Sequence, residues 1–192
     1  MATGSRLLVG DSMDPCTLNI QTASLRYPEG GDFDVLFVDT PGFGLNDRTD
    51  EKTLDEIAKW LRTQYVRFSV PFDTFFTTST THSSHGRDIK LDGIIYFGRI
   101  TDNRIARIPF SIVVKLMGLC GTDNLRNTIL ATTMWDEVDE KLGSHYEREL
   151  RTKHWTQMIQ RGSQMVRYLN TPESAREIIH HILQTAGVRS TF

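Results

Sequence analysis

Apolar runs alternate with amphipathic segments along the chain. Runs rich in β-branched residues predict strands buried on both faces at Phe33–Asp39, Leu91–Ile100 and Arg126–Thr133. A shorter run predicts a weaker fourth strand at Ser163–Asn170. Between Thr17 and Tyr27 apolar and polar residues alternate, which is typical of an edge strand with one wet face.

Helical patterns separate these strands. Apolar residues spaced i, i+3, i+4 and i+7 predict an amphipathic helix within Arg48–Tyr65. A proline at the start and glycines at the end predict another helix that begins at Pro109 and closes at Gly118 or Gly121. Two more are predicted at Ser144–Gly162 and Thr171–Gly187, the last with Thr171 as N-cap. Strands that alternate with helices favour an α/β fold, with a mostly parallel sheet covered on both faces.

Size and composition indicate one soluble domain. The chain has 192 residues, of which 39% are hydrophobic and 24% charged, and its net charge of -2 gives no reason to expect nucleic acid as a partner. The longest apolar stretch carries Lys115 and falls short of the roughly 20 residues of a membrane span. Cys16 and Cys120 stand apart, which favours a reduced, cytoplasmic setting.

One segment, at about residues 66–86, does not follow the alternation of strands and helices. Every residue from Thr77 to His85 is Ser, Thr or His, so we expect a disordered insertion there. Zinc binding by His82 and His85 has little support, since no further ligands accompany them.

The strand Phe33–Asp39 ends in Asp39-Thr40-Pro41-Gly42. An aspartate at the carboxyl end of a strand can hold Mg²⁺ through water, and a glycine three residues later lets its amide approach a terminal phosphate closely. The pattern Asp-x-x-Gly also arises by chance, in which case it marks only a strand that ends in a tight turn.

Two further features support a nucleotide site in chain order. Asp136 follows the strand Arg126–Thr133, and its carboxylate can accept two hydrogen bonds from the ring and exocyclic N–H groups of guanine, which adenine cannot supply together. Thr17 begins the predicted edge strand, where its hydroxyl can join the Mg²⁺ shell when a loop closes over the γ-phosphate. The alternative for Thr17 is an ordinary strand residue.

These motifs together resemble the GTP-binding domain of large P-loop GTPases, closest to the fungal G-domain proteins related to septins and immunity-associated GTPases. "VGDSMDPCT" resembles the first switch, "FVDTPGFG" the second switch and "TTMWDEV" the guanine-reading loop. The resemblance implies a three-layer P-loop NTPase fold that binds GTP or GDP with Mg²⁺. In that picture Thr133 belongs to the guanine-reading loop, and Asn170 and Thr171 form the loop that backs the base.

The chain departs from this family at three places. Thr133-Met134-Trp135-Asp136 stands where many GTPases have Asn-Lys-x-Asp, and Phe43 follows Gly42 where some have a glutamine that orients water. No G-x-x-x-x-G-K-[ST] occurs, so the first strand, phosphate loop and first helix of the family are expected to be missing. An inaccurate gene model would explain both this absence and the insertion at 66–86.

Two functions remain open from the sequence. One is guanine-nucleotide binding, with GTP hydrolysis if a phosphate loop exists in the full product. The other is a catalytically inactive G domain that binds a protein partner through its switch surfaces. A homodimer through the nucleotide-binding face is a further expectation from the family.

Overall fold

The computed structural model describes residues 19–27, 33–42, 49–67, 93–101, 114–115 and 125–187. Contacts within the chain divide it into two compact units, one of residues 3–90 and the other of residues 91–192 together with residues 1–2. Each unit is described by itself.

The unit of residues 3–90 contains an antiparallel pair of strands. β1 (Gln21–Tyr27) pairs with β2 (Phe33–Asp39) in a register that sets Gln21 opposite Asp39. Alternation along β1 buries Ala23 and exposes Thr22 and Ser24, as expected for an edge strand with one wet face.

The helix of this unit, α1 (Asp50–Arg67), begins at a threonine cap. The Thr49 hydroxyl accepts a hydrogen bond from the Lys52 amide at 3.4 Å, and acidic residues occupy the first turn, where the helix dipole favours negative charge. Its buried stripe consists of Thr53, Leu54, Ile57 and Ala58. The predicted amphipathic helix is therefore confirmed.

The unit of residues 91–192 is built on a three-stranded parallel sheet, ordered β3-β4-β5. The strands are β3 (Ile94–Arg99), β4 (Thr128–Thr133) and β5 (Gln164–Arg167). β4 lies in the middle, and its first five residues are buried, which explains why its sequence reads as an unbroken apolar and β-branched run.

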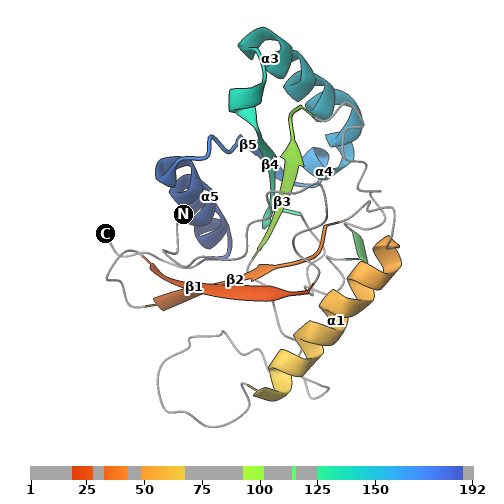
Figure 1. Ribbon diagram of the computed structural model, residues 1–192, viewed down its shortest axis with the longest axis vertical. Coiled ribbons are helices and arrows are strands. Elements are labelled where there is room, and N and C mark those ends of the chain that lie inside the picture. The colour runs from red at the N-terminus through yellow and green to blue at the C-terminus, as the bar shows by residue number, and fades with distance from the viewer. Residues whose placement is uncertain are drawn as a thin grey trace. The chain divides into compact units, whose positions relative to one another are not determined.

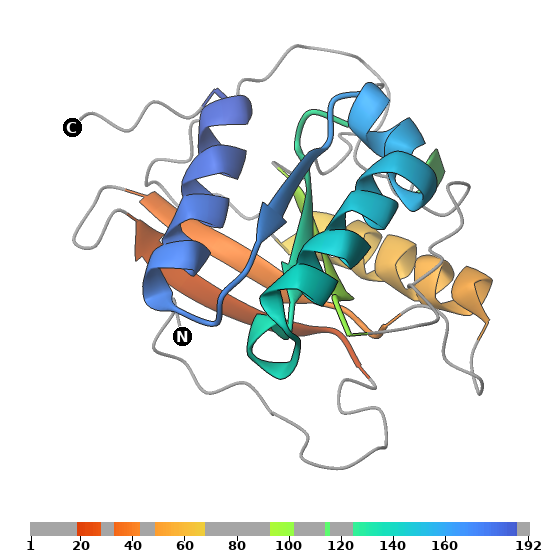
Figure 2. The same cartoon turned by 90° about the horizontal axis from the view of Figure 1, so that it is seen from above.

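Helices cover both faces of this sheet, as Figures 1 and 2 show. They are α3 (Glu140–Glu149), the π-helical turn η2 (Leu150–His154), α4 (Thr156–Gln160) and α5 (Pro172–Thr185). α5 lies on one face, and the chain from α3 through α4 lies on the other. The α/β class with a parallel sheet is thus confirmed.

The larger core lies on the α3 side of the sheet. Leu130 of β4 packs in one cluster with Leu150, Trp155 and Met158, all at most 3% exposed. Trp155 lies directly over β3, since a Cβ added at Gly98 would come within 3.1 Å of its ring. Gly98 is therefore the residue that allows the indole to cross the strand.

The smaller core lies under α5. Ile129 and Ala131 of β4 are fully buried against Ile178 of the helix. Thr171 caps α5 by accepting a hydrogen bond from the Ser174 amide at 3.2 Å, and Pro172 opens the helix, both as predicted.

Two of the predictions about burial and helix bounds need correction, and two further predictions concern residues outside the described ranges. Leu36 of β2 and Phe97 of β3 are 49% and 52% exposed, so these strands are not buried on both faces. The helix predicted from Ser144 begins at Glu140, because Asp139 caps it, and a π-helical turn interrupts it. Apart from Val114 and Lys115 the predicted helix Pro109–Gly121 lies outside the described residues, as does the insertion beyond the end of α1.

The central position of β4 predicts a large difference between two identical substitutions. Leu130→Ala removes a side chain that is 1% exposed, and we expect a loss of about 2–5 kcal/mol in the free energy of unfolding. Leu142→Ala, at a residue of α3 that is 44% exposed, should change it by no more than about 0.5 kcal/mol. Urea unfolding of both variants measures the difference, and equal losses would contradict the assigned core.

Candidate functional site

The candidate site lies at the carboxyl ends of β4 and β5. Thr133 is the last residue of β4, and Asp136 follows in the short 3₁₀ turn η1 (Trp135–Glu137). Asn170 and Thr171 follow β5, between that strand and α5. Because β4 and β5 are neighbouring parallel strands, these four predicted residues come to the same edge of one sheet.

Both loops at this edge contain a residue in the left-handed conformation. Among the residues described, the non-glycine residues with positive φ are Met134 (61°) and Asn170 (56°). Such a conformation is rare for a residue like Met134 and is disfavoured by roughly 1–2 kcal/mol. Conformations of this kind concentrate at functional sites, which favours this edge as a binding site.

Trp135 anchors the turn that carries Asp136. Its indole Nε1 donates to the Thr132 carbonyl at 3.2 Å and to the Thr132 hydroxyl at 3.0 Å. The ring lies against Gly143 of α3, where an added Cβ would come within 2.8 Å of Cζ3. A glycine inside a helix lowers the stability of that helix. The space that the Trp135 indole needs explains why a glycine occupies position 143.

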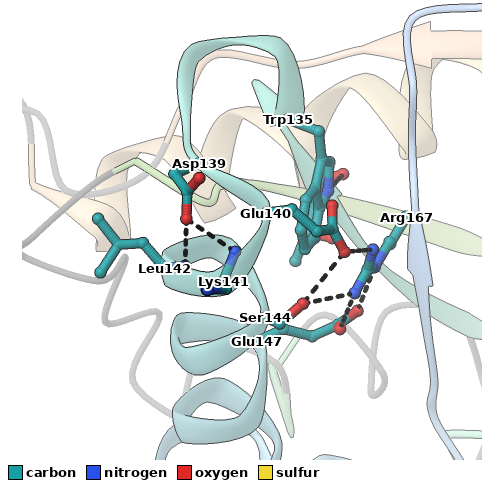
Figure 3. Close-up of polar contacts among 9 residues, drawn as sticks. Trp135, Asp139, Glu140, Lys141, Leu142, Ser144, Glu147 and Arg167 are labelled. Atoms are coloured by element: carbon teal, nitrogen blue, oxygen red, sulfur yellow. Dashed lines mark hydrogen bonds and ion pairs between the residues drawn. The ribbon is translucent and has the colours of Figure 1, made fainter.

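Arg167, the last residue of β5, lies over the ring of Trp135. Its guanidinium carbon lies 4.0 Å from the centre of the Trp135 ring, in cation–π geometry. The guanidinium also donates to both carboxylate oxygens of Glu147, at 3.0 and 2.7 Å. Further donors reach Glu140 at 3.0 Å and Ser144 at 3.3 Å, as Figure 3 shows.

This network is electrostatically favourable. Hydrogen bonding to Glu147 raises the pKa of Arg167 above its already high ordinary value, with Glu140 adding to the effect and partial burial opposing it. The two acids and Ser144 are spaced i, i+4 and i+7 along α3, so they share the helix face that meets β5. Arg167 therefore joins β5, α3 and the Trp135 ring.

The Asp136 carboxylate is available to a ligand. Its side chain is exposed, and within the described part of the chain no hydrogen bond or ion pair involves that carboxylate. The neighbouring Glu137, by contrast, lies 3.8 Å from Arg99 of β3 in an exposed ion pair. The sequence pattern that singled out Asp136 thus corresponds to an accessible acceptor at the sheet edge.

The other three residues at this edge are engaged with the protein. The Thr133 hydroxyl points to the Gly98 carbonyl at the long distance of 3.5 Å. Thr171 uses its hydroxyl to cap α5, and Asn170 accepts a long hydrogen bond of 3.5 Å from Tyr168 Oη. The cap explains Thr171 without a ligand, whereas the left-handed backbone explains why an asparagine suits position 170.

The remaining predicted residues belong to the unit of residues 3–90. Asp39 is the half-buried last residue of β2, followed by the buried Pro41 and the exposed Gly42. Among the described residues, a Cβ at Gly42 would meet no atom within 4 Å. Thr17 lies outside the described residues, and the roles of all three residues stay predictions.

The sequence patterns did not single out the network around Trp135. Two signals were present: Arg167 is a charged residue inside a short apolar strand, and Glu140, Ser144 and Glu147 form a polar stripe at helical spacing. Neither signal identifies the partner, because the partners of Arg167 lie 20 or more residues away along the chain.

Comparison with known proteins adds no relative. No family model, curated protein or solved structure matches the chain. Within the described ranges, no cluster of three or more His, Cys, Asp or Glu side chains is arranged to hold a metal ion. Across those same ranges, no helix has the length and apolar character needed to cross a membrane.

The contact between Gly143 and Trp135 predicts the effect of one methyl group. Gly143→Ala improves helix propensity by about 1 kcal/mol, but the new Cβ displaces the indole, so we expect a net loss of about 1–3 kcal/mol in unfolding free energy. Lys141→Ala on the exposed part of the same helix is the matched control and should be nearly neutral. A Gly143→Ala variant more stable than the parent in urea unfolding would show that the indole does not need this space.

Proposed function

We propose that the protein is a guanine-nucleotide-binding G-domain protein of the P-loop NTPase type. The observation that carries the proposal is the exposed Asp136 carboxylate at the carboxyl edge of a parallel sheet. Ligands of open α/β sheets bind at this edge. A carboxylate there matches the two adjacent N–H donors of guanine, which adenine does not present together.

Further residues receive roles in this proposal. Thr133 belongs to the guanine-binding loop together with Asp136, and Asn170 and Thr171 back the base from the end of β5. Support comes from their shared sheet edge and from the left-handed backbone at Met134 and Asn170. Met134 offers a polarisable side chain on which a base can stack, in place of the lysine stem common in GTPases.

For the unit of residues 3–90, the proposal gives Thr17, Asp39 and Gly42 the roles at phosphate and Mg²⁺ that their sequence motifs imply. Asp39 ends a strand with a carboxylate, the oxygen ligand that Mg²⁺ prefers, and Thr17 would add a hydroxyl. A bound Mg²⁺ would neutralise charge on the β- and γ-phosphate oxygens. Gly42, which has no side chain, would let its amide approach the γ-phosphate.

Hydrolysis by this site is expected to be slow. Phe43 follows Gly42, and its apolar side chain can neither orient nor activate a water molecule. A group that accelerates hydrolysis would have to come from another part of the protein or from a partner. We therefore propose nucleotide binding as the principal property and GTP hydrolysis as a secondary one.

A second candidate is a catalytically inactive G domain that serves as a protein-interaction module. The observation in its favour is that the 192 residues contain no G-x-x-x-x-G-K-[ST], the motif whose amides and lysine surround the phosphates. Such a module would bind a protein partner, or a second copy of itself, through its switch surfaces. Nucleotide affinity distinguishes the two candidates.

Exchange of the Asp136 acceptor for a donor tests the base specificity. Titration with fluorescent GTP and Mg²⁺ should give saturable binding that Asp136→Ala weakens at least about tenfold, since a charge-assisted pair of hydrogen bonds is lost. Asp136→Asn should shift preference toward xanthine nucleotides, whose C2 carbonyl accepts from the new amide. Glu137→Gln, which removes the neighbouring exposed charge, is the control and should leave affinity unchanged.

The outcomes separate the two candidates. Saturable GTP binding that depends on Asp136 excludes the inactive module. If fluorescent GTP does not bind the full chain even at high concentration, the guanine-nucleotide proposal fails.

The role of Asp39 predicts a change in Mg²⁺ dependence. Chelation of Mg²⁺ should weaken GTP binding to the parent protein, whereas binding to Asp39→Asn should be weaker from the start and respond little to chelation. Asp55→Asn on the exposed face of α1 is the matched control and should keep the parental response. An Asp39→Asn variant with an unchanged response to chelation would show that Asp39 does not hold Mg²⁺.

A further inference from the structure

The turn that carries Asp136 has little internal support. η1 is a single 3₁₀ turn without a side-chain cap, closed by one long hydrogen bond of 3.3 Å from the Glu137 amide to the Met134 carbonyl. The preceding Met134 has the disfavoured left-handed conformation. The turn alone therefore does not hold the Asp136 carboxylate in one orientation, and support must come from its neighbours.

Arg167 supports this turn from both of its ends. At the N-terminal end, its guanidinium lies on the ring of Trp135, whose Nε1 is bonded to Thr132 of β4. Beyond the C-terminal end, it holds Glu140 and Glu147 of α3, the helix that follows the turn after Val138 and Asp139. The side chain is 34% exposed, so most of it is removed from solvent in this position.

The geometry is specific to arginine. The Nε–H and one Nη–H form a fork that meets both oxygens of Glu147, while the other terminal nitrogen reaches Glu140. The same planar group stacks on the indole of Trp135. A lysine carries the same charge but can neither fork nor stack in this way.

We propose that Arg167 is a positioning residue that aligns the Asp136 carboxylate with the 2-amino group of guanine, and so sets the preference of the site for guanine over hypoxanthine. The inference rests on the proposed guanine-nucleotide binding. Recognition by two parallel hydrogen bonds tolerates displacements of only about 0.5 Å. If the turn is loosened, the hydrogen bond from the 2-amino group of guanine to Asp136 is therefore lost before nucleotide binding as a whole is lost.

The test compares two diphosphates that differ only in this amino group. Dissociation constants of GDP and of inosine diphosphate, which lacks it, are measured for the parent protein and for Arg167→Met, Arg167→Lys and Arg148→Met. The parent should prefer GDP by roughly tenfold, the effect of one hydrogen bond to a charged group. Arg148→Met removes an exposed charge from α3 and should keep this preference.

Arg167→Met and Arg167→Lys should both reduce the preference to about twofold or less, with GDP losing affinity and inosine diphosphate nearly unaffected. A general loss of structure would weaken both ligands equally and leave their ratio unchanged, and that result would overturn the inference. If Arg167→Met does not fold, Glu147→Gln serves instead: it weakens the fork while Arg167 remains on the indole, and the ratio should again fall.

The proposed function and this inference fail in different ways. If the parent protein binds neither diphosphate, the proposed function fails and the inference with it. If the parent prefers GDP and the Arg167 variants keep that preference, the inference alone fails. Equal binding of both diphosphates by the parent would show that Asp136 does not read the 2-amino group, which also overturns the inference.

Discussion

The parallel pairing of β4 with a strand on each side is the constraint on which the unit of residues 91–192 depends. β3 and β5 both align on β4, and its alternating residues reach into both cores. Leu130 faces the cluster under α3 and α4, and Ile129 faces the cluster under α5. The backbone groups of β4 are hydrogen-bonded to a strand on each side, which fixes β4 in the sheet. The loops that follow β4 and β5 therefore meet at one edge of the sheet.

The segment between β4 and α3 is less regular than the buried strand that precedes it. The chain leaves the sheet through Met134 in a left-handed conformation and then forms a turn of one 3₁₀ step before α3 begins. Such a turn exposes Asp136, whereas the adjacent Trp135 is held by Thr132, Gly143 and Arg167. An exposed polar side chain next to a firmly held aromatic one is an arrangement suited to presenting a ligand group at a defined place.

Local pattern was a good guide to the elements and a poor guide to their surroundings. The strands of the parallel sheet, the amphipathic α1 and the capped α5 follow from periodicity and from end signals, which depend on neighbours a few residues away. Burial was less predictable. Leu36 and Phe97 look like core residues by composition, yet each is about half exposed, because burial depends on what covers a strand and not on the strand itself.

Side-chain chemistry and short-range periodicity were enough to predict the strands of the parallel sheet, the helices α1 and α5, the α/β class and the position of Asp136 just after a buried strand. Three contacts could be seen only in the folded chain: Arg167 meets Trp135 and Glu147, Gly143 makes room for the indole, and Gly98 lies under Trp155. Those contacts join residues far apart in the chain, and their geometry exists only once the strands have paired and the helices have packed on the sheet.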